Sequence, residues 1–308
     1  VFMYRAFGGG TTTFTAHLAK ALALSGHSVD IIRVRQHSEC RQVARGFAGY
    51  EMMTYRNVGV DEALRLVKSK PSLMTAPCNA KHLEFDPQVI GKLIKAGMRV
   101  VVHDPTEFEI YDALDGLSAL KLRRPLCIRL QMREHLPTSV YVPHPYVREF
   151  SRDCRPPGHN RTWRALCVSR VTFKKRIEVM AAANRLMSKK NMIHVCGGEN
   201  RMYTHHKLFK DFPEMRDQQQ FGFPSGWGVS ARLCARAKFA VDLSWFKDDG
   251  GGTQYTFMEA WDAGTINIIS TDWLSYSGEM VANRNCLSTR AEPRALADVV
   301  ECAAYDNK

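Results

Sequence analysis

The sequence predicts an α/β protein built from two doubly wound domains, each with a parallel sheet that helices cover on both faces. Short apolar runs alternate with segments of helical periodicity, and the runs are nearly continuous in apolar residues, as in strands buried on both faces. The alternation starts again after residues 142–160, where four prolines and a glycine are typical of an interdomain connection. A chain of 308 residues is also long enough for two domains.

In the first half, an apolar run, three glycines and an amphipathic segment that ends at Gly26 predict a strand, a turn and a helix. Later runs rich in Val, Ile, Leu and Met predict further strands with helices between them. The strands are expected at Phe2–Phe7, Ser28–Val34, Leu73–Pro77, Met98–His103 and Cys127–Leu130. The helices are expected at about Thr12–Leu24, Asp61–Lys70 and Pro87–Ala96.

The second half repeats this rhythm. Strands are expected at Trp163–Ser169, Met192–Gly197, Gln219–Phe223, Phe239–Leu243 and Ile266–Ser270. Helices are expected near Lys174–Ser188, Gly228–Ala237, Thr253–Ala263 and Arg294–Ala304. We therefore divide the chain into residues 1–148, residues 149–293 and a C-terminal helix, 294–308, that could pack back on the first domain.

The composition limits the classes of binding partner and the cellular compartments that we expect for this protein. Lys and Arg number 43 against 31 Asp and Glu, a net charge of +12, and this excess favours a polyanionic partner such as nucleic acid, an anionic membrane or a phosphorylated substrate. No apolar run reaches the ~18 residues of a membrane-spanning helix, and no secretion signal is evident. The nine cysteines are odd in number and have no C-x-x-C spacing, so we expect no disulfide framework or zinc site and a reducing, cytoplasmic location.

A glycine-rich turn follows the first expected strand. Gly9 and Gly10 let the backbone approach a ligand, and Thr11 can cap the helix whose first N–H groups attract a phosphate. The spacing is not G-x-G-x-x-G, and Arg33 and Arg35 stand where an NAD-binding domain has an acidic residue. The turn therefore predicts a phosphate contact other than NAD, or a tight turn without a ligand.

The second half also has residues suited to a phosphate at its strand ends. Arg170 ends a strand and Lys175 begins the next helix, so a planar fork of donors and a point charge can meet at one diphosphate. Residues 248–253, DDGGGT, open a later helix whose backbone N–H groups suit phosphate oxygens. Glu259 on that helix can accept hydrogen bonds from two ribose hydroxyls. Each motif alone is weak, and the combination is specific.

This combination resembles the GT-B glycosyltransferases, in particular the large retaining group that includes sucrose synthase-like and glycogen synthase-like enzymes. Arg170 and Lys175 match the family's strand–Arg–x4–Lys segment. Glu259-Ala260 and residues 263–269 match its Glu-Ala helix and the strand that follows. The resemblance covers most of the chain. It implies two Rossmann-like parallel-sheet domains that face each other across a cleft, with the acceptor on the first domain and a nucleotide-sugar, a UDP-sugar, on the second.

The resemblance also assigns donor contacts. Arg170 and Lys175 would hold the diphosphate and Glu259 the ribose. Backbone groups of both glycine-rich loops would meet the donor, at Gly9, Gly10, Thr11, Gly251, Gly252 and Thr253. The family has a second Glu eight residues before the ribose Glu, and Gly251 stands there in this chain. Asp248 or Asp249 could replace that carboxylate, and the identity of the sugar stays open.

The expected catalytic residues are His103, Arg170, Lys175 and Asp249. His103 ends a strand and could contact the donor sugar, although a structural histidine with satisfied hydrogen bonds would look the same. Arg170 and Lys175 would stabilise the charge that develops on the departing nucleoside diphosphate. Retention of configuration is implied by the resemblance alone. No His and carboxylate set has metal-ligand spacing, so we expect no metal and no cofactor beyond the UDP-sugar co-substrate.

The acceptor is the least determined part of the prediction. Arg33 and Arg35 lie in one basic stretch, and Arg123 and Arg124 lie in another. Such side chains suit a phosphate backbone, and the aromatic residues Phe47, Tyr50 and Tyr55 near the first stretch suit an extruded base. Solvated faces and loops are the alternative interpretation of the same residues.

The short chain resembles compact phage-encoded transferases that glycosylate hydroxymethylated pyrimidines in DNA. We therefore expect double-stranded DNA as the acceptor, in the host cytoplasm if the protein is phage-encoded, and no stable membrane insertion. The alternatives are a transferase acting on a cell-surface glycan or lipid-linked sugar, a non-catalytic module that binds nucleotide-sugar or nucleic acid, and an epimerase of the same fold. The sequence makes no prediction of oligomeric state.

Overall fold

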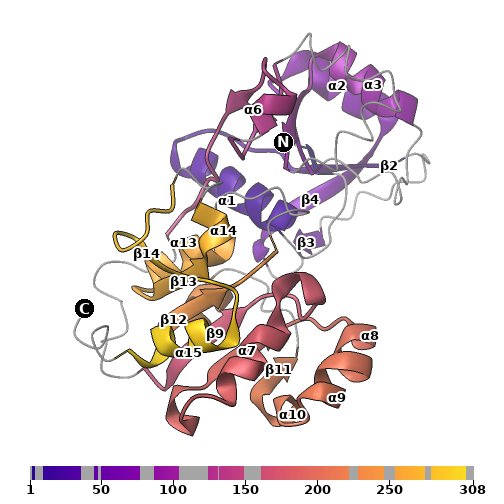
Figure 1. Ribbon diagram of the computed structural model, residues 1–308. Coiled ribbons are helices and arrows are strands. Elements are labelled where there is room, and N and C mark those ends of the chain that lie inside the picture. Colours follow the sequence, from indigo (N-terminus) through magenta and orange to yellow (C-terminus); the bar gives the residue numbers. More distant parts are fainter. Residues whose placement is uncertain are drawn as a thin grey trace. The chain divides into compact units, whose positions relative to one another are not determined.

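The computed structural model describes residues 2–3, 10–35, 45–47, 50–76, 87–103, 124–130, 132–148, 161–221, 228–245, 254–274 and 279–302. The chain divides into two compact units, Val1–Val147 and Arg148–Lys308, and each is built on its own sheet (Figure 1).

The first unit has a sheet in the order β3-β4-β2-β1-β5-β6-β7-β8. Neighbouring strands are parallel except β3 and β4, which are antiparallel. The strands are β1 (Phe2–Met3), β2 (Ile32–Arg35), β3 (Arg45–Phe47), β4 (Tyr50–Gly59), β5 (Leu73–Ala76), β6 (Arg99–Val102), β7 (Leu126–Cys127) and β8 (Val140–Tyr141). The helices described are α1 (Gly10–Leu24), α2 (Val60–Ser69), α3 (Pro87–Ala96) and α6 (Met132–His135).

The amphipathic helices form where the apolar period predicts them. Helix α3 has the predicted bounds, and its Ile90, Leu93 and Ile94 are buried in a core. The same core holds Met98, just before β6, and Val100 in β6. Spacing of three and four residues places these side chains on one helix face, which therefore covers the sheet. Helices α1 and α2 begin within two residues of their predicted starts.

Strand β4 was not predicted. Its sequence, YEMMTYRNVG, carries charged and amide side chains rather than a continuous apolar run, yet it pairs in parallel with β2. Arg56 is tolerated in the sheet because it pairs with Asp30 at 2.8 Å and with Glu62 at 2.5 Å. The sequence led us to expect that Tyr55 could stack on a base, but its side chain is buried and is therefore not available for that contact. The side chains of Phe47 and Tyr50 lie outside the described set.

The second unit has a fully parallel sheet in the order β11-β10-β9-β12-β13-β14. Its strands are β9 (Trp163–Val168), β10 (Ile193–Gly197), β11 (Gln219–Phe221), β12 (Ala237–Asp242), β13 (Ile266–Ser270) and β14 (Cys286–Thr289). Its helical segments are η5 (Phe173–Lys175), α7 (Ile177–Asn184), η6 (Lys189–Asn191), α8 (Arg201–Tyr203), η7 (Thr204–Leu208), α9 (Phe209–Asp211), α10 (Met215–Gln218), α11 (Val229–Ala235), α13 (Tyr255–Asp262), α14 (Thr271–Leu274) and α15 (Pro293–Glu301).

Helices cover both faces of this sheet, which explains why its central strand β9 is mainly apolar on both sides. Along β9, Ala165 and Cys167 face a core that includes residues of α7 and α15. Leu166 and Val168 face the opposite side, where α11 and α13 pack. Successive side chains of a strand point to opposite faces, so burial on both sides removes the polar alternation of a half-exposed strand.

Two helices of this unit differ from the prediction. The helix expected over Lys174–Ser188 is divided into η5 and α7, because Arg176 between them has a left-handed backbone with φ 51°. The C-terminal helix α15 is no separate segment, because its Leu296 and Val300 are buried in the core of the second unit beside α7 (Figure 1). The apolar face that we expected to meet the first domain is therefore used within the second.

Candidate functional site

The second sheet has a topological switch point between β9 and β12. The chain runs from β9 outward to β10 and β11 on one side, then returns to β12 on the other side of β9 and continues outward to β13 and β14. Connections therefore leave the carboxyl ends of β9 and β12 in opposite directions, and such an edge is where open parallel sheets bind ligands. Arg170 follows β9, and Ser244 follows β12.

Arg170 is held at this edge by its backbone. The Ser169 amide donates to the carbonyl oxygen of Cys196 at 3.0 Å, and the Val171 amide donates to the carbonyl oxygen of Gly198 at 2.8 Å. The Arg170 side chain is exposed. Among the described residues it forms no side-chain hydrogen bond or ion pair, so its guanidinium is available to an anion.

The ends of β9 and β10 approach each other closely because residue 197 is glycine. A Cβ at this position would lie 1.7 Å from the carbonyl oxygen of Ser169. Any larger residue would force one of the two backbones to move. Gly197 thus helps to set the position of the Ser169–Arg170 segment.

Lys175 lies at the same edge, at the end of η5, and only 9% of its surface is exposed. Its Nζ donates a hydrogen bond to Ser244 Oγ at 2.6 Å. The backbone beside it is also tied to the end of β12, because the Trp245 amide donates to the carbonyl oxygen of Lys174 at 2.7 Å. The structure therefore brings the predicted diphosphate lysine to the end of β12, next to β9, the strand that Arg170 follows.

Asp242, the last residue of β12, is linked to Lys175 through Ser244. Its Oδ1 accepts hydrogen bonds from the Ser244 amide, at 2.8 Å, and from the Ser244 hydroxyl. Its Oδ2 is buried and has no hydrogen-bond partner among the described residues. A buried carboxylate next to a buried ammonium is a costly arrangement unless the two charges offset each other.

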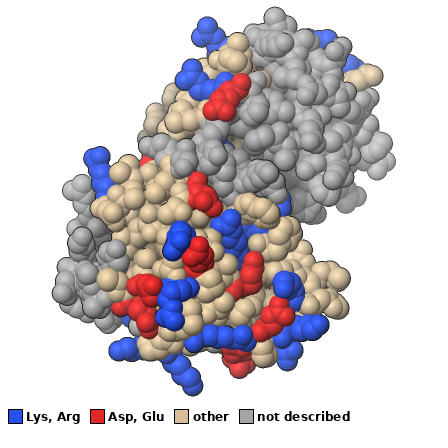
Figure 2. Space-filling view, viewed as in Figure 1, with Lys and Arg blue, Asp and Glu red and all other residues tan. Residues whose placement is uncertain are grey.

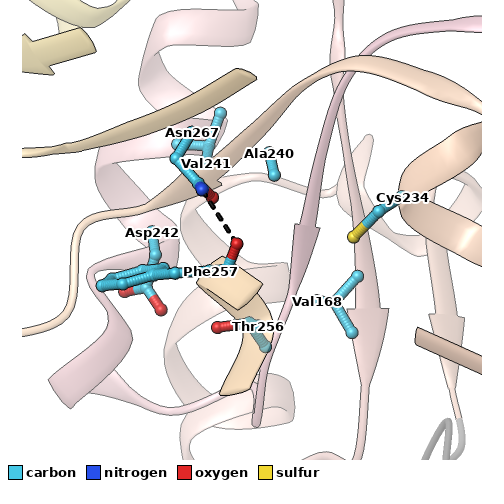
Figure 3. A pocket seen from close by; sticks show the side chains of 8 residues that line it. All are labelled: Val168, Cys234, Ala240, Val241, Asp242, Thr256, Phe257 and Asn267. Carbon is cyan, nitrogen blue, oxygen red and sulfur yellow. Dashed lines mark hydrogen bonds between the residues drawn. The ribbon is translucent and has the colours of Figure 1, made fainter. Parts of the chain in front are cut away.

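A small pocket opens beside Asp242 between the sheet and the start of α13 (Figure 3). The Thr256 hydroxyl, which also has no hydrogen-bond partner among the described residues, points toward the Asp242 carboxylate in that view. On the other side of the pocket, Asn267 Nδ2 donates to the carbonyl oxygen of Phe257 at 3.0 Å and fixes the first turn of α13 to β13.

The predicted ribose residue, Glu259, lies on α13 and is half-buried. Burial raises the pKa of the Cys234 thiol on the adjacent α11, and the charge of Glu259 raises it further. Glu259 thus lies on a helix that packs against α11. The predicted donor residues Asp249, Gly251, Gly252 and Thr253 lie outside the described residues.

The first sheet has its own switch point, between β1 and β5. Gly10 and Thr11 begin α1, the helix that follows β1, and Gly9 lies outside the described residues. Thr15 Oγ1 donates to the carbonyl oxygen of Thr11 at 2.9 Å and lies 2.6 Å from Thr75 Oγ1. These buried hydroxyls fix the start of α1 against β5, next to the carboxyl end of the sheet.

His103 is buried at the end of β6, and its Nε2 lies 2.7 Å from the carbonyl oxygen of Thr75. A carbonyl can only accept, so Nε2 carries the proton and donates it. The ring also meets Phe14 edge to face at 5.1 Å between centroids. These contacts are those of a structural histidine, and they hold the ring in place at the end of β6.

The four arginines predicted for the acceptor do not form one cluster in the described residues. Arg33 is half-buried in β2, and Arg124 is exposed just before β7. Four strand spacings, about 19 Å, separate β2 from β7 in the sheet order. The side chain of Arg35 and the whole of Arg123 lie outside the described set.

Sequence reasoning missed Asp242 and Ser244. The run AVDLS was interpreted only as a buried strand, although an acidic residue in such a run is itself a signal, because a buried carboxylate needs partners. In the part of the chain that the structure describes, we find no group of His, Cys, Asp and Glu suited to a metal ion. No helix there is both long and apolar enough to span a bilayer.

The fold matches solved glycosyltransferase structures. No protein-family model matches the sequence, and no curated protein matches it. An alpha-glucosyltransferase, solved with UDP and a 13-mer DNA containing an HMU base, has a TM-score of 0.69 at 14% identity, over 99% of this chain and 91% of that one. Anabaena HepE, solved with UDP and glucose, has a TM-score of 0.65 at 11% identity, over 97% and 88%. The predicted GT-B fold is thereby confirmed.

Proposed function

We propose that this chain is a glycosyltransferase that moves a sugar from a UDP-sugar to a hydroxyl group of an acceptor. The observation that carries the proposal is the placement of Arg170 and Lys175 at the edge where β9 and β12 diverge. A guanidinium and an ammonium at one strand edge suit the two phosphates of a nucleoside diphosphate. Both the alpha-glucosyltransferase and Anabaena HepE were solved with UDP, which supports a UDP-linked donor.

In this proposal, residues 149–293 bind the nucleotide-sugar. Arg170 and Lys175 contact the diphosphate, and Glu259 accepts hydrogen bonds from the ribose. The glycine-rich segment 251–253 offers backbone amides, and Asp249 contacts the sugar. The bond that breaks joins the anomeric carbon to the diphosphate, so negative charge grows on the leaving group, and the two fixed cations stabilise it.

Residues 1–148 take the acceptor side, with Gly9, Gly10 and Thr11 meeting the donor from the start of α1. His103 contacts the donor sugar in this proposal, from a position at the end of β6 that the Nε2 hydrogen bond to the Thr75 carbonyl fixes. Retention of configuration belongs to the same proposal.

We assign a 5-hydroxymethylpyrimidine base in double-stranded DNA as the acceptor. The net charge of +12 favours a polyanion, and the fold is shared with an alpha-glucosyltransferase solved with DNA. Figure 2 shows Lys and Arg interspersed with Asp and Glu on the visible face of the second unit, so that face is no uniform basic patch.

The DNA contact is assigned instead to Arg33, Arg35, Arg123 and Arg124 of the first domain. The ~19 Å between β2 and β7 corresponds to about six base pairs of duplex at 3.4 Å each. Phage DNA in a host cytoplasm is the setting that this acceptor implies.

The test is transfer of label from a radiolabelled UDP-sugar to DNA. Three duplexes of one sequence are compared, with 5-hydroxymethylcytosine, with 5-hydroxymethyluracil and with unmodified bases. The proposal expects label on at least one hydroxymethylated duplex and none on the unmodified one. The affinity of the protein for the hydroxymethylated duplex should fall steeply as the salt concentration rises, because phosphate contacts release counterions.

A glycan or lipid-linked sugar is the second candidate acceptor, favoured by the likeness to Anabaena HepE, which was solved with UDP and glucose. Label on such an acceptor, and on no DNA, would decide for it. A non-catalytic binding module is a third candidate. Lys175→Ala separates it from an enzyme, because only an enzyme has a transfer or donor-hydrolysis rate that this change can abolish while the fold stays intact.

A further inference from the structure

Three buried polar groups form a hydrogen-bonded chain behind the proposed diphosphate site. Lys175 Nζ donates to Ser244 Oγ at 2.6 Å, and the Ser244 hydroxyl and amide both meet Asp242 Oδ1. The exposed fractions are 9% for Lys175, 1% for Ser244 and 7% for Asp242. The chain thus links a cation of the proposed site to a carboxylate that the proposed reaction does not otherwise use.

The direction of each hydrogen bond follows from the donors available. An ammonium has only donors, so Ser244 Oγ must accept from Lys175. An ionised carboxylate has only acceptors, and the single proton of the hydroxyl therefore goes to Asp242. The Ser244 hydroxyl gives its proton to Asp242 and a lone pair to Lys175, so it has one orientation. This orientation holds the ammonium of Lys175 in one place.

The carboxylate also explains how the ammonium can be buried before a ligand arrives. A charge removed from water is costly unless an opposite charge offsets it. Asp242 lies one hydroxyl away from Lys175 and is buried on the same strand end. A second tie, from the Trp245 amide to the Lys174 carbonyl, keeps the two backbones together.

We propose that Asp242 is a positioning residue that, through Ser244, holds the Lys175 ammonium in place for the diphosphate of the nucleotide-sugar. This inference rests on the proposed function. A cation fixed before the reaction needs no reorganisation when charge develops on the leaving group, and this is where fixed charges contribute most. Asp242 and Ser244 would not themselves contact the donor.

A purely structural role makes a different prediction. If the chain only joins β12 to η5, its loss would lower stability and weaken every part of nucleotide binding alike. If it positions Lys175, its loss weakens the binding of UDP and leaves the binding of uridine, which has no phosphate, unchanged. The ratio of UDP to uridine affinity therefore separates the two roles.

The experiment is calorimetric titration of UDP and of uridine into the full chain and its variants. The variants are Ser244→Ala, which breaks the chain, Ser244→Thr, which keeps the hydroxyl, and Asp242→Asn, which removes the charge. Ser139→Ala is the matched control, because Ser139 is a buried serine with a hydroxyl hydrogen bond in the first unit. Thermal melting checks that each variant folds.

For Ser244→Ala and Asp242→Asn we expect UDP affinity to fall at least ~10-fold, the lower end for a hydrogen bond to a charged group, with uridine affinity unchanged. Ser244→Thr and Ser139→Ala should bind UDP as the wild type does. Equal UDP affinity in Ser244→Ala, or an equal loss for UDP and uridine, overturns the inference. Failure of the wild type to bind UDP overturns the proposed function instead.

A measurement on the wild type covers the case in which the variants do not fold. In nitrogen-15 spectra of the lysine side chains, a buried and hydrogen-bonded ammonium gives a signal whose protons exchange slowly with water. We expect one such signal without UDP, assigned to Lys175 by its absence in Lys175→Arg. An ammonium signal for Lys175 that becomes protected only after UDP is added would overturn the inference.

Discussion

Replacing Gly197 with alanine should force the ends of β10 and β9 apart. The new Cβ would lie 1.7 Å from the carbonyl oxygen of Ser169 and 2.6 Å from its carbonyl carbon. Carbon contacts are normally ~3.5 Å or longer, so one backbone would have to shift by about 1.5–2 Å. The shift would break the hydrogen bond from the Ser169 amide to the Cys196 carbonyl, which is 3.0 Å long.

The size of the effect follows from these contacts. Overpacking of a rigid site costs about 1–3 kcal/mol, and a lost backbone hydrogen bond adds about 1 kcal/mol. In a domain of this size each kcal/mol lowers Tm by about 2–4 °C, so the total loss of about 2–4 kcal/mol predicts a fall of roughly 4–16 °C. Because Arg170 follows Ser169, UDP affinity should fall as well.

Scanning calorimetry and UDP titration measure both effects. Gly91→Ala in α3 is the matched control, since a Cβ there meets nothing within 4 Å, and it should stabilise the helix by about 0.5–1 kcal/mol. If Gly197→Ala melts and binds UDP as the wild type does, the close approach of the two strand ends does not position Arg170, and the reasoning is refuted.

Three further predictions test separate contacts. Arg170→Ala should weaken UDP binding by ~1–3 kcal/mol, as for a charge-assisted hydrogen bond, and unchanged affinity in a calorimetric titration would contradict the diphosphate assignment. Burial lowers the pKa of His144 to about 3, so the stability it contributes is full above its unfolded pKa of ~6.5 and is lost as pH falls toward the folded value. NMR titration should therefore find a neutral ring from pH 8 to 5, and protonation near pH 6.5 would be evidence against this environment. Arg56→Met removes the pairs with Asp30 and Glu62 and should cost about 1 kcal/mol in urea unfolding, given their partial exposure. The Arg56 hydrogen bond lowers the pKa of Asp30, so the Asp30 part of this cost should be full above 3.8 and decline as pH falls through the lower folded pKa. A cost that stays constant as the pH falls well below 3.8 would contradict it.

The elements with strong patterns could be predicted from the sequence. Strand β13 has the predicted bounds, Ile266–Ser270, because it is a short run rich in isoleucine that Gly264 separates from the preceding helix. Strand β4 could not, because Arg56 occupies its middle and is stabilised there by partners 26 and 6 residues away in the sequence. Pairing over such distances leaves no local signal.

Residues of the candidate site could be singled out from the sequence only where residue type and position agree. Arg170 and Lys175 follow a strand end, and the sheet order places them at a switch point. Asp242 and Ser244 become meaningful only when the fold carries Lys175 to the end of β12. The basic stretches around Arg33 and Arg124 look alike in sequence, yet four strand spacings separate β2 from β7 in the sheet. The separation could not be predicted, because the number of charges carries no information on strand order.

A crystal structure of this protein with UDP bound would test the central claim most directly. The account predicts that the diphosphate lies at the carboxyl ends of β9 and β12, with its oxygens within hydrogen-bonding distance of the Arg170 guanidinium and the Lys175 ammonium. UDP bound elsewhere, or bound at this edge with neither side chain on its phosphates, would contradict it.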